Sequence, residues 1–409
     1  MEIKLIIPPN FYIADETASP PLQFEPFYNY ADIDFVHLQR GDSFDTIPEA
    51  EMYGISAYTP DIKVSNQIAR FLKLRDPKCK IAIGGYHATY QTADIDDIYD
   101  YVVVGHGEKF IENIVNDTLL EDRYFIDSSK RIEYNKRAYK HFARYNPCHH
   151  YENSKGYTIR TSYGCYWNCR FCVSHNGVLF RKAAEIERQL DFLRENGVGN
   201  IRIIDDIFTE HPEFPELCKL LSDFKWMAQT RIERLADENV KRMTESGCYG
   251  FQVGIESFDS QVREKLNKKL TDKQIRDGMA ITKNYGLDLY CFIILGTPFD
   301  TTETIKSTVG KCNYYSGVAF RPLIFCPFPG TAIGDNPSKY NTRLLTKQYE
   351  YYTTIPFQNI HGRVVSVPNH VQDVDSWETL LRKSLYELNT PIVKGILDNP
   401  LTEWHTNYA

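Results

Sequence analysis

Gly164-Cys165-Tyr166-Trp167-Asn168-Cys169-Arg170-Phe171-Cys172 is the most informative part of the sequence, because it places three of the ten cysteines within eight residues. Three thiolates on one tight loop suit three irons of a cubane cluster and leave the fourth iron open for another ligand. Structural zinc usually takes two CxxC pairs, and the sequence holds no second pair, so zinc is the weaker alternative. The spacing therefore favours Cys165, Cys169 and Cys172 as ligands of an iron–sulfur cluster.

The cysteine motif comes directly after the first of several strand-like runs that alternate with helical patterns. The strand-like runs are 158–162, 201–204, 226–230, 250–255, 287–295 and 318–325. The helical patterns between them are 183–195, 212–221, 237–246, 272–285 and 302–315. Successive strands joined by helices predict a partial (β/α)6 barrel with its site at the carboxyl ends of the strands. We place this barrel at residues 157–336.

The segment before the barrel, residues 1–117, predicts a second parallel sheet. Strand-like runs at 3–7, 52–58, 80–84 and 101–104, with a helical pattern at 64–74, predict a Rossmann-like domain whose ligand loops follow the strands. Residues 118–156 are polar and rich in Tyr and Asn, which indicates a hairpin and a linker. Residues 337–409 are predicted to form a small α-rich extension, with helices at 344–354 and 376–388 and a strand at 363–367. The fold class is α/β.

Charge and hydropathy exclude several classes of partner. The 409-residue chain has a formal net charge of -7, so no global positive field attracts nucleic acid or an anionic membrane. Its longest apolar stretch, residues 287–296, is about half of the ~20 residues that a membrane helix needs. The first apolar run ends at Pro8 and Pro9 and is too short for a signal peptide. We expect a cytoplasmic protein that acts on a small molecule or a nucleotide, without a membrane partner and not primarily on nucleic acid.

The cysteine stretch followed by a βα barrel resembles the radical S-adenosylmethionine (radical SAM) superfamily. The resemblance implies a 4Fe–4S cluster whose open iron binds the amino and carboxylate groups of S-adenosylmethionine. It also implies an enzyme that takes an electron from a reductant such as a flavodoxin or ferredoxin and forms a 5′-deoxyadenosyl radical. That radical abstracts hydrogen from an unreactive carbon of the substrate. The alternatives are a nucleic-acid or nucleotide modification enzyme of the same chemistry and a non-catalytic iron–sulfur sensor or scaffold.

The same resemblance assigns S-adenosylmethionine contacts to the strand ends. A carboxylate pair suits an ammonium group and an arginine fork suits a carboxylate, although an exposed ion pair remains the other interpretation of Arg231. The implied set is Phe171, Asp205, Asp206, Arg231, Glu256, Ser257, Leu295 and Gly296. The apolar fifth strand is equally typical of plain barrel core. Cys326 is a candidate hydrogen-atom donor, with a small buried hydrophobe as the alternative.

The glycine-bearing loops at 54–57, 84–89 and 104–108 resemble the cobalamin-binding-type domain found ahead of many radical SAM barrels. Glycines there let a flat macrocycle approach the backbone closely. The implied contacts are Ser56, Thr59, Gly84, Gly85, His87, Gly105, Gly107 and Glu108.

Two departures leave cobalamin itself open. The helix that usually follows the first strand is replaced by the proline-rich stretch 20–26 and a polar, Tyr-rich segment. The Asp-x-His-x-x-Gly signature is also absent, because Asp34, His37 and Gly41 have a different spacing. If cobalamin binds, methylation is the expected outcome. Without it, radical rearrangement or isomerisation is favoured.

Overall fold

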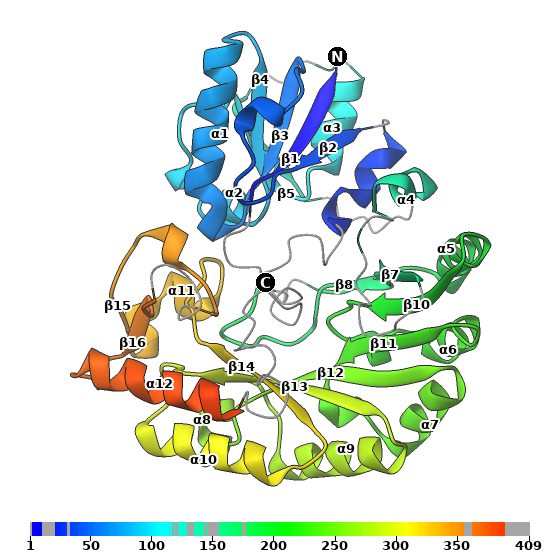
Figure 1. Ribbon diagram of the computed structural model, residues 1–409, viewed down its shortest axis with the longest axis vertical. Coiled ribbons are helices and arrows are strands. Elements are labelled where there is room, and N and C mark those ends of the chain that lie inside the picture. The colour runs from blue at the N-terminus through cyan, green and yellow to red at the C-terminus, as the bar shows by residue number, and fades with distance from the viewer. Residues whose placement is uncertain are drawn as a thin grey trace.

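The computed structural model describes residues 2–9, 21–30, 33–116, 118, 122–128, 135–142, 145, 155–173, 177–355 and 362–388. Two six-stranded parallel sheets form the body of the molecule, one in the N-terminal half and one in the barrel. Figure 1 shows the N-terminal sheet in blue and cyan above the green and yellow barrel. The α/β class predicted from the sequence is confirmed.

The N-terminal sheet has the strand order β2-β1-β3-β4-β5-β6. Its strands are β1 (Ile3–Ile7), β2 (Asp34–His37), β3 (Met52–Ser56), β4 (Lys80–Gly84), β5 (Tyr101–Gly105) and β6 (Tyr124–Asp127). Its helices are α1 (Ile62–Arg75), α2 (Tyr86–Tyr90), α3 (Glu108–Val115) and α4 (Lys136–Phe142). Because the strands are parallel, the loops after β3, β4 and β5 meet at one edge of the sheet.

Two strands of this sheet differ from the sequence prediction. Residues 124–126, expected as one arm of a hairpin, lie in β6, which pairs in parallel with β5, from Val102 opposite Tyr124 to Gly105 opposite Asp127. β2 was not predicted, and it pairs in parallel with β1 at the other edge. Both are short edge strands whose partner lies far away in sequence, so their local pattern does not reveal the pairing. The expected second arm at 131–134 lies outside the described residues.

The stretch after β1 forms a 3-10 helix, η1 (Leu22–Asn29), with Pro26 inside it. Over these described residues the chain is not α-helical, since Pro26 cannot donate the hydrogen bond that an α-helix needs. Phe24 and Phe27 of η1 are buried against the N-terminal sheet. The apolar side of η1 therefore closes the sheet's carboxyl edge.

The barrel sheet has the order β14-β13-β12-β11-β10-β7 and is open between β14 and β7. Its strands are β7 (Lys155–Ile159), β10 (Val198–Ile203), β11 (Lys225–Thr230), β12 (Cys248–Glu256), β13 (Asp288–Leu295) and β14 (Ala319–Ile324). Helices α5 (Ala183–Glu195), α6 (Phe214–Leu220), α7 (Asp237–Glu245), α9 (Asp272–Asn284) and α10 (Thr302–Tyr314) connect them. Trp226, Phe251 and Ile293 are fully buried in its core, each contributing roughly 1.5–3 kcal/mol by burial. The partial barrel is confirmed.

The C-terminal segment packs against the barrel through α12 (Val374–Leu388), which contacts α10 and β14. Figure 1 shows α12 alongside α10. The predicted helix at 344–354 is wrong: the chain there forms the end of β15 (Thr342–Leu344) and a 3-10 turn, η8 (Tyr349–Tyr351). β15 pairs antiparallel with β16 (Ser366–Pro368), three residues beyond the predicted start of that strand. No helix among the described residues is long and apolar enough to cross a membrane.

Candidate active site

The cysteine loop is fixed at its entrance by a glycine. The chain enters the loop through β8 (Ser162–Tyr163), which pairs with β9 (Leu179–Phe180). Gly164 has φ +90, and a Cβ there would lie 2.2 Å from the carbonyl oxygen of Gly177. Only glycine fits this close crossing of two backbones. Gly164 therefore sets the direction in which the three cysteines leave the strand.

Three hydrogen bonds attach the far side of the loop to the barrel. The Arg170 amide donates to the Leu266 carbonyl at 3.0 Å, and the Ile333 amide donates to the Arg170 carbonyl at 3.1 Å. The Asn267 Nδ2 donates to the Asn168 carbonyl at 2.7 Å. Leu266 and Asn267 follow α8 (Ser260–Lys265), and Ile333 lies in α11 (Ala332–Asp335). The loop is thus held from both sides, as a preorganised cluster site requires.

The cysteines differ in burial. Cys169 is buried, whereas Cys165 and Cys172 are partly exposed. Burial raises the pKa of the Cys165 thiol to about 11 and also raises that of Cys169, although Lys268 partly opposes the latter. A bound cation deprotonates such thiols outright. In the described part of the chain, no three His, Cys, Asp or Glu side chains converge on one metal ion. Thiolates that bind separate irons of a cubane need no such convergence, so the donor set fits a cluster.

Below the loop, Glu256 and Lys268 form a buried ion pair at the end of β12. The Lys268 Nζ donates to the Glu256 Oε1 at 2.8 Å, and both side chains are less than 10% exposed. Burial lowers the pKa of Lys268, but the negative charges of Glu256 and Cys169 outweigh this and raise it. Glu256 has φ 67 at a register shift between β12 and β13, an unusual conformation for a non-glycine residue. Lys268 is a functional candidate that sequence reasoning missed.

Arg231 lies in the same constellation. Its guanidinium carbon is 4.0 Å from the centroid of the Trp167 ring, in the cysteine loop. Its Nη2 donates to the Lys268 carbonyl at 2.7 Å, and its Nε is paired with Glu233. Arg231 is 5% exposed, so it is not the exposed ion-pair partner of the alternative interpretation. It connects the cysteine loop to the Glu256–Lys268 pair and leaves donors for a carboxylate.

The two acidic residues after β10 have different surroundings. Asp205 is fully buried, accepts a 2.7 Å hydrogen bond from the Thr161 amide and is also bonded to the Thr161 hydroxyl. Burial raises the pKa of Asp205, while the bonds from Thr161 oppose the rise. Asp205 therefore holds the end of β7 in place and does not line the cavity described below. Asp206 is exposed and does line it.

The remaining predicted barrel residues are mainly enclosed by neighbours. Ser257 is buried, with its Oγ 3.2 Å from Thr308 Oγ1, and Phe171 packs beside Val262 and Leu266. Leu295 is fully buried, and a Cβ on Gly296 would lie 3.2 Å from Leu381 of α12, so this glycine permits close helix packing.

Cys326 is buried beside Tyr352 and Val365, and burial raises the pKa of its thiol well above the ordinary value. This placement fits the small-hydrophobe interpretation of Cys326.

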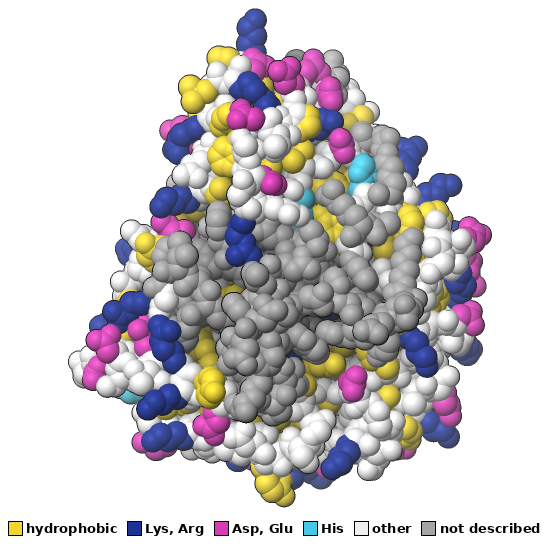
Figure 2. Space-filling model, in the orientation of Figure 1, with side chains coloured by type: hydrophobic (Ala, Val, Ile, Leu, Met, Phe, Trp, Pro, Cys, Tyr) yellow, Lys and Arg dark blue, Asp and Glu magenta, His cyan; other side chains and the backbone are white. Residues whose placement is uncertain are grey.

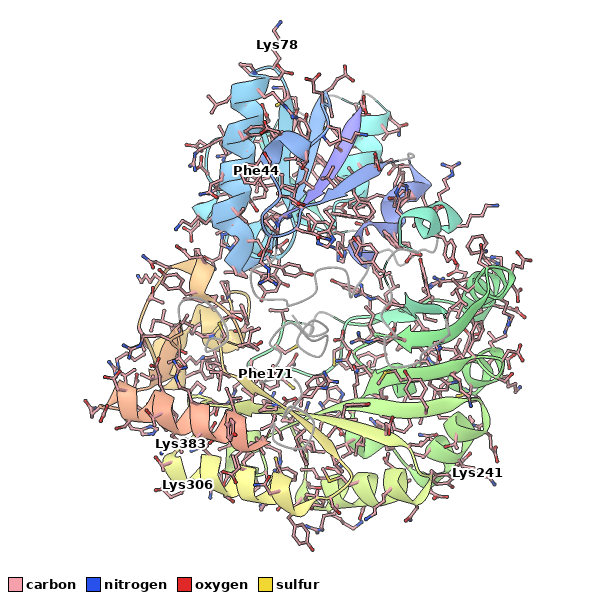
Figure 3. The ribbon with its side chains drawn as sticks, in the orientation of Figure 1. Phe44, Lys78, Phe171, Lys241, Lys306 and Lys383 are labelled. Atoms are coloured by element: carbon pink, nitrogen blue, oxygen red, sulfur yellow. The ribbon has the colours of Figure 1, made fainter. Side chains whose placement is uncertain are left out.

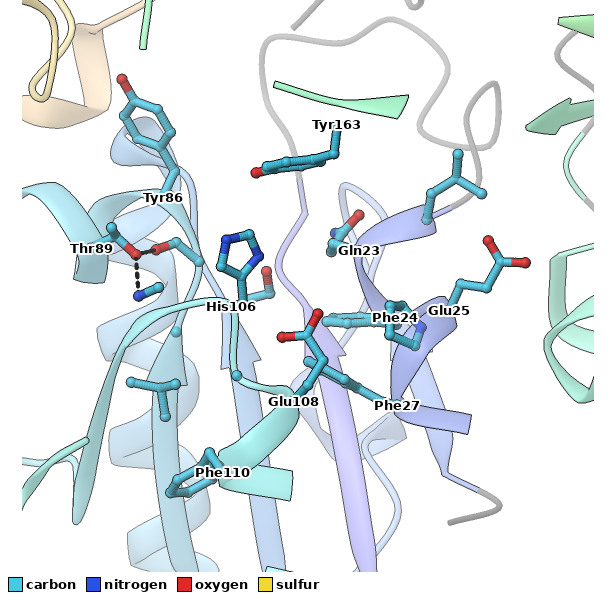
Figure 4. A pocket seen from close by; sticks show the side chains of 18 of the residues that line it. Gln23, Phe24, Glu25, Phe27, Tyr86, Thr89, His106, Glu108, Phe110 and Tyr163 are labelled. Carbon is cyan, nitrogen blue, oxygen red and sulfur yellow. Dashed lines mark hydrogen bonds between the residues drawn. The ribbon is translucent and has the colours of Figure 1, made fainter. Parts of the chain in front are cut away.

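A cavity of about 470 Å³ lies between the N-terminal sheet and the cysteine loop. Figure 4 shows Tyr163 above His106, with Glu108 below them and Phe24 and Phe27 entering from η1. The rings of His106 and Tyr163 meet edge to face, 5.4 Å apart. The barrel contributes Arg160, Ser162, Tyr163, Gly164, Val173, Gly177, Ile204 and Asp206 to its lining. Both domains therefore face one shared space.

The structure gathers most of the predicted cobalamin-type residues at this cavity. Ser56, Gly84, Gly85, Gly105, Gly107 and Glu108 line it. Thr59 and His87 are buried and do not. His87 packs edge to face on Tyr349 of η8, 4.9 Å between centroids, and burial lowers its pKa to about 4.

Sequence reasoning did not single out Gln23 and Glu25 of η1 or Tyr90 of α2, and it included Tyr86 and Thr89 only as members of the predicted loop 84–89. Pro20-Pro21, which indicates a chain that turns back, was the only signal for η1.

The glycine loops fit a large flat ligand. Gly107 has φ +87, and a Cβ there would reach within 3.4 Å of the Phe27 ring, so a side chain would fill the cradle. Gly85 has φ +90, and a Cβ at this position would lie 3.0 Å from the backbone of Ala57. The loop is tied down because the Gly105 amide donates to Thr89 Oγ1 at 3.0 Å, drawn in Figure 4.

Comparison with known proteins defines the class. Residues 159–312 match the family model of the radical SAM superfamily, and residues 46–115 match that of the B12 binding domain. The chain therefore carries a radical SAM domain and, ahead of it, a B12-binding domain. It is an enzyme of the radical SAM class, which implies a 4Fe–4S cluster and S-adenosylmethionine as cofactors and supports cobalamin as a further one.

Particular relatives point to methyltransferases. The chain is 30% identical over 209 residues to an uncharacterized methyltransferase of Pyrococcus horikoshii, covering 48% of this chain and 45% of that protein. It is 22% identical over 391 residues to the bacteriochlorophyllide d C-8(2)-methyltransferase of Chlorobaculum tepidum, covering 87% and 84% of the two chains. Thus the chain spans less than half of the first relative and most of the second.

Solved structures share the fold. The radical S-adenosylmethionine methyltransferase TsrM from Kitasatospora setae, with cobalamin and a [4Fe-4S] cluster bound, superposes with a TM-score of 0.69. The identity is 14%, and the match covers 96% of this chain and 90% of that one. The cobalamin-dependent radical enzyme OxsB matches with a TM-score of 0.60 and 15% identity, over 87% of this chain and 57% of that one. The predicted pairing of a cobalamin-type domain with a radical SAM barrel is confirmed at the level of the fold.

Proposed function

We propose that this protein is a cobalamin-dependent radical SAM methyltransferase that places a methyl group on an unreactive carbon of a small-molecule substrate. The observation that carries the proposal is the single cavity lined by the glycine loops of the B12-binding domain and by the cysteine-loop side of the barrel. A methyl carrier bound to the first domain would face the cluster and S-adenosylmethionine across this space. Relatives named as methyltransferases support methylation over rearrangement.

Cys165, Cys169 and Cys172 would hold the cluster, which would bind S-adenosylmethionine and supply the electron for its cleavage. Asp206 offers a carboxylate to the ammonium group of S-adenosylmethionine, since it is exposed toward the cavity. Arg231 would offer its remaining guanidinium donors to the carboxylate of that cofactor.

The buried pair of Glu256 and Lys268 fixes a carboxylate at the end of β12, where it would accept hydrogen bonds from the ribose hydroxyls of S-adenosylmethionine. These charges are already paired in the protein, so binding requires little rearrangement.

The cavity would hold cobalamin, which supplies a methyl group on a metal centre. Ser56 and the glycines of the three loops let the backbone approach the macrocycle, while Phe24 and Phe27 of η1 exclude water from one side. Arg160, whose guanidinium carbon is 5.2 Å from the centroid of the Tyr163 ring, brings a cation to the barrel side of the cavity. The substrate would enter between these groups and Asp206.

Filling the cavity tests the proposal. Ser56→Trp adds a large side chain to the cavity wall, and Ser307→Trp makes the same change on the exposed side of α10. The protein is reconstituted with iron and sulfide, incubated with hydroxocobalamin and passed through gel filtration. We expect cobalt near one atom per chain in the wild type and in Ser307→Trp, and less than about a tenth of that in Ser56→Trp. Equal cobalt in both variants, or none in the wild type, would contradict the proposal.

A further inference from the structure

The cysteine loop has an inner and an outer side. Tyr163, Gly164 and Val173 line the cavity, so the inner side faces the B12-binding domain. Residues 168–170 instead contact the end of α8 and α11 through the hydrogen bonds of Asn168 and Arg170. Arg170 directly follows Cys169, so this outer side lies one residue from a cluster ligand. An electron carrier that cannot enter the cavity would have to approach the cluster from here.

Four cations lie on the loop itself or on the segments that hold its outer side. Lys265, Lys269 and Lys339 are exposed, and Arg170 is partly exposed. The Arg170 Nη1 donates to the Lys265 carbonyl at 2.5 Å, which joins the loop to α8. Arg170 and Lys339 lie over the same Tyr340 ring, at 5.4 and 5.6 Å from its centroid. We define Arg170, Lys265, Lys269 and Lys339 as the basic face.

The charge of the basic face opposes that of the whole chain. The chain has a net charge of -7, and in Figure 2 cationic and anionic side chains are interspersed over the visible face. Two exposed carboxylates, Glu264 and Asp335, lie beside the basic face. The four cations outnumber them, so the net charge of this area is positive. A local field of this kind accelerates and orients association with an acidic partner.

We propose that the basic face is the docking surface for an acidic one-electron carrier protein that reduces the cluster. The carrier loses one electron and the cluster gains it, with no transfer of atoms. The inference rests on the proposed function, because it assumes a cluster in the cysteine loop. It adds the place where that partner makes contact.

Charge reversal on matched surfaces tests the docking. The face variant carries Lys265→Glu, Lys269→Glu and Lys339→Glu. The control variant carries Lys78→Glu, Lys241→Glu and Lys306→Glu, with the same change in net charge at exposed positions that Figure 3 shows at the edges of the molecule. Arg170 is left intact because it holds the loop. Anaerobic stopped-flow measures the rate at which a flavodoxin hydroquinone is oxidised by each reconstituted protein.

We expect the second-order rate constant of the face variant to fall about tenfold or more at low salt and to lose most of its salt dependence. The control variant should stay within about twofold of the wild type. Equal rates for the two variants would overturn the docking surface. A second assay with dithionite, which needs no docking, measures 5′-deoxyadenosine and should give equal yields in all three proteins. If dithionite gives none even in the wild type, the proposed function fails, while the flavodoxin rates still decide the docking surface.

Discussion

At the scale of single residues, the site is built from charges that are buried in pairs. Lys268 and Glu256 share a 2.8 Å hydrogen bond beside Cys169, and Arg231 is paired with Glu233 below Trp167. Buried charges persist only when a partner compensates their loss of hydration. Their positions are therefore fixed before any cofactor binds, and removing one partner leaves the other uncompensated.

Lys268→Met tests this dependence. We expect the free energy of unfolding to fall by about 3 kcal/mol, because Glu256 is left charged and buried without its partner. The double variant Lys268→Met with Glu256→Gln should lose less than the sum of the two single variants. Lys269→Met, at the exposed neighbouring position, should change stability by less than about 0.5 kcal/mol. Urea unfolding measures all four, and strict additivity would contradict the pairing.

Glu25 gives a prediction about pH. It is 7% exposed at the cavity, and burial raises the pKa of its carboxyl to about 7 from the ordinary 4.5, despite the opposing charge of Arg181. Because the pKa of Glu25 is higher in the folded state, its contribution to stability is fully present below about pH 4.5 and is lost as the pH rises to about 7. Glu25→Gln should therefore equal the wild type at low pH and exceed it by about 3 kcal/mol at pH 8. Unfolding free energies at pH 4.5 to 8 measure this, and a pH-independent difference would disprove it.

At the scale of elements, the cysteine loop depends on how β8 and β9 cross. A Cβ added at Gly164 would lie 2.2 Å from the carbonyl oxygen of Gly177. A Cβ added at Gly177 would have no neighbouring atom within 4 Å. Both glycines have positive φ, so alanine is strained at either position. The two sites therefore share conformational strain and differ in steric conflict.

Gly164→Ala should displace the loop and prevent cluster assembly. We expect its iron content after reconstitution to fall below half of the wild-type value, because the Cβ forces β8 and β9 apart. Gly177→Ala should retain most of its iron, since it adds strain without a clash. Iron and sulfide analysis with the absorbance of the cluster measures both variants. Loss of iron in Gly177→Ala alone would show that the crossing does not position the cysteines.

Sequence alone predicted the elements whose signal is local. The boundaries of β1 and β4 match the predicted residues. Each strand is a short Ile-rich run, and the first is followed by Pro8 while the second ends at Gly84. The cysteine loop was found because its three cysteines lie close together in the sequence, so their spacing can be read without the fold.

The missed features depend on long-range pairing. β6 joins the first sheet through contacts that no local pattern encodes, and Lys268 reaches Glu256 only because residues 267–269 fold back over β12. Asp205 and Asp206 are neighbours in sequence, yet only the fold turns one toward Thr161 and the other toward the cavity.

At the scale of the whole molecule, the two domains enclose one chemical space. Tyr86 of α2 donates to the Pro329 carbonyl at 2.6 Å, and Tyr349 of η8 donates to Asp94 at 2.7 Å. Lys63 of α1 pairs with Glu350 at 2.9 Å. These contacts hold the glycine loops opposite the cysteine loop, so the B12-binding domain covers the end of the barrel that carries the cysteine loop.

The most direct test of cobalamin-dependent methyl transfer is one anaerobic assay of both S-adenosylmethionine products. The reconstituted protein receives dithionite and S-adenosylmethionine, with or without cobalamin, and mass spectrometry quantifies 5′-deoxyadenosine and S-adenosylhomocysteine. The variant with Cys165, Cys169 and Cys172 changed to Ala is the blank. We expect S-adenosylhomocysteine only with cobalamin, and no 5′-deoxyadenosine in the blank. S-adenosylhomocysteine that forms equally without cobalamin, or no cleavage by a fully loaded cluster, would contradict the account.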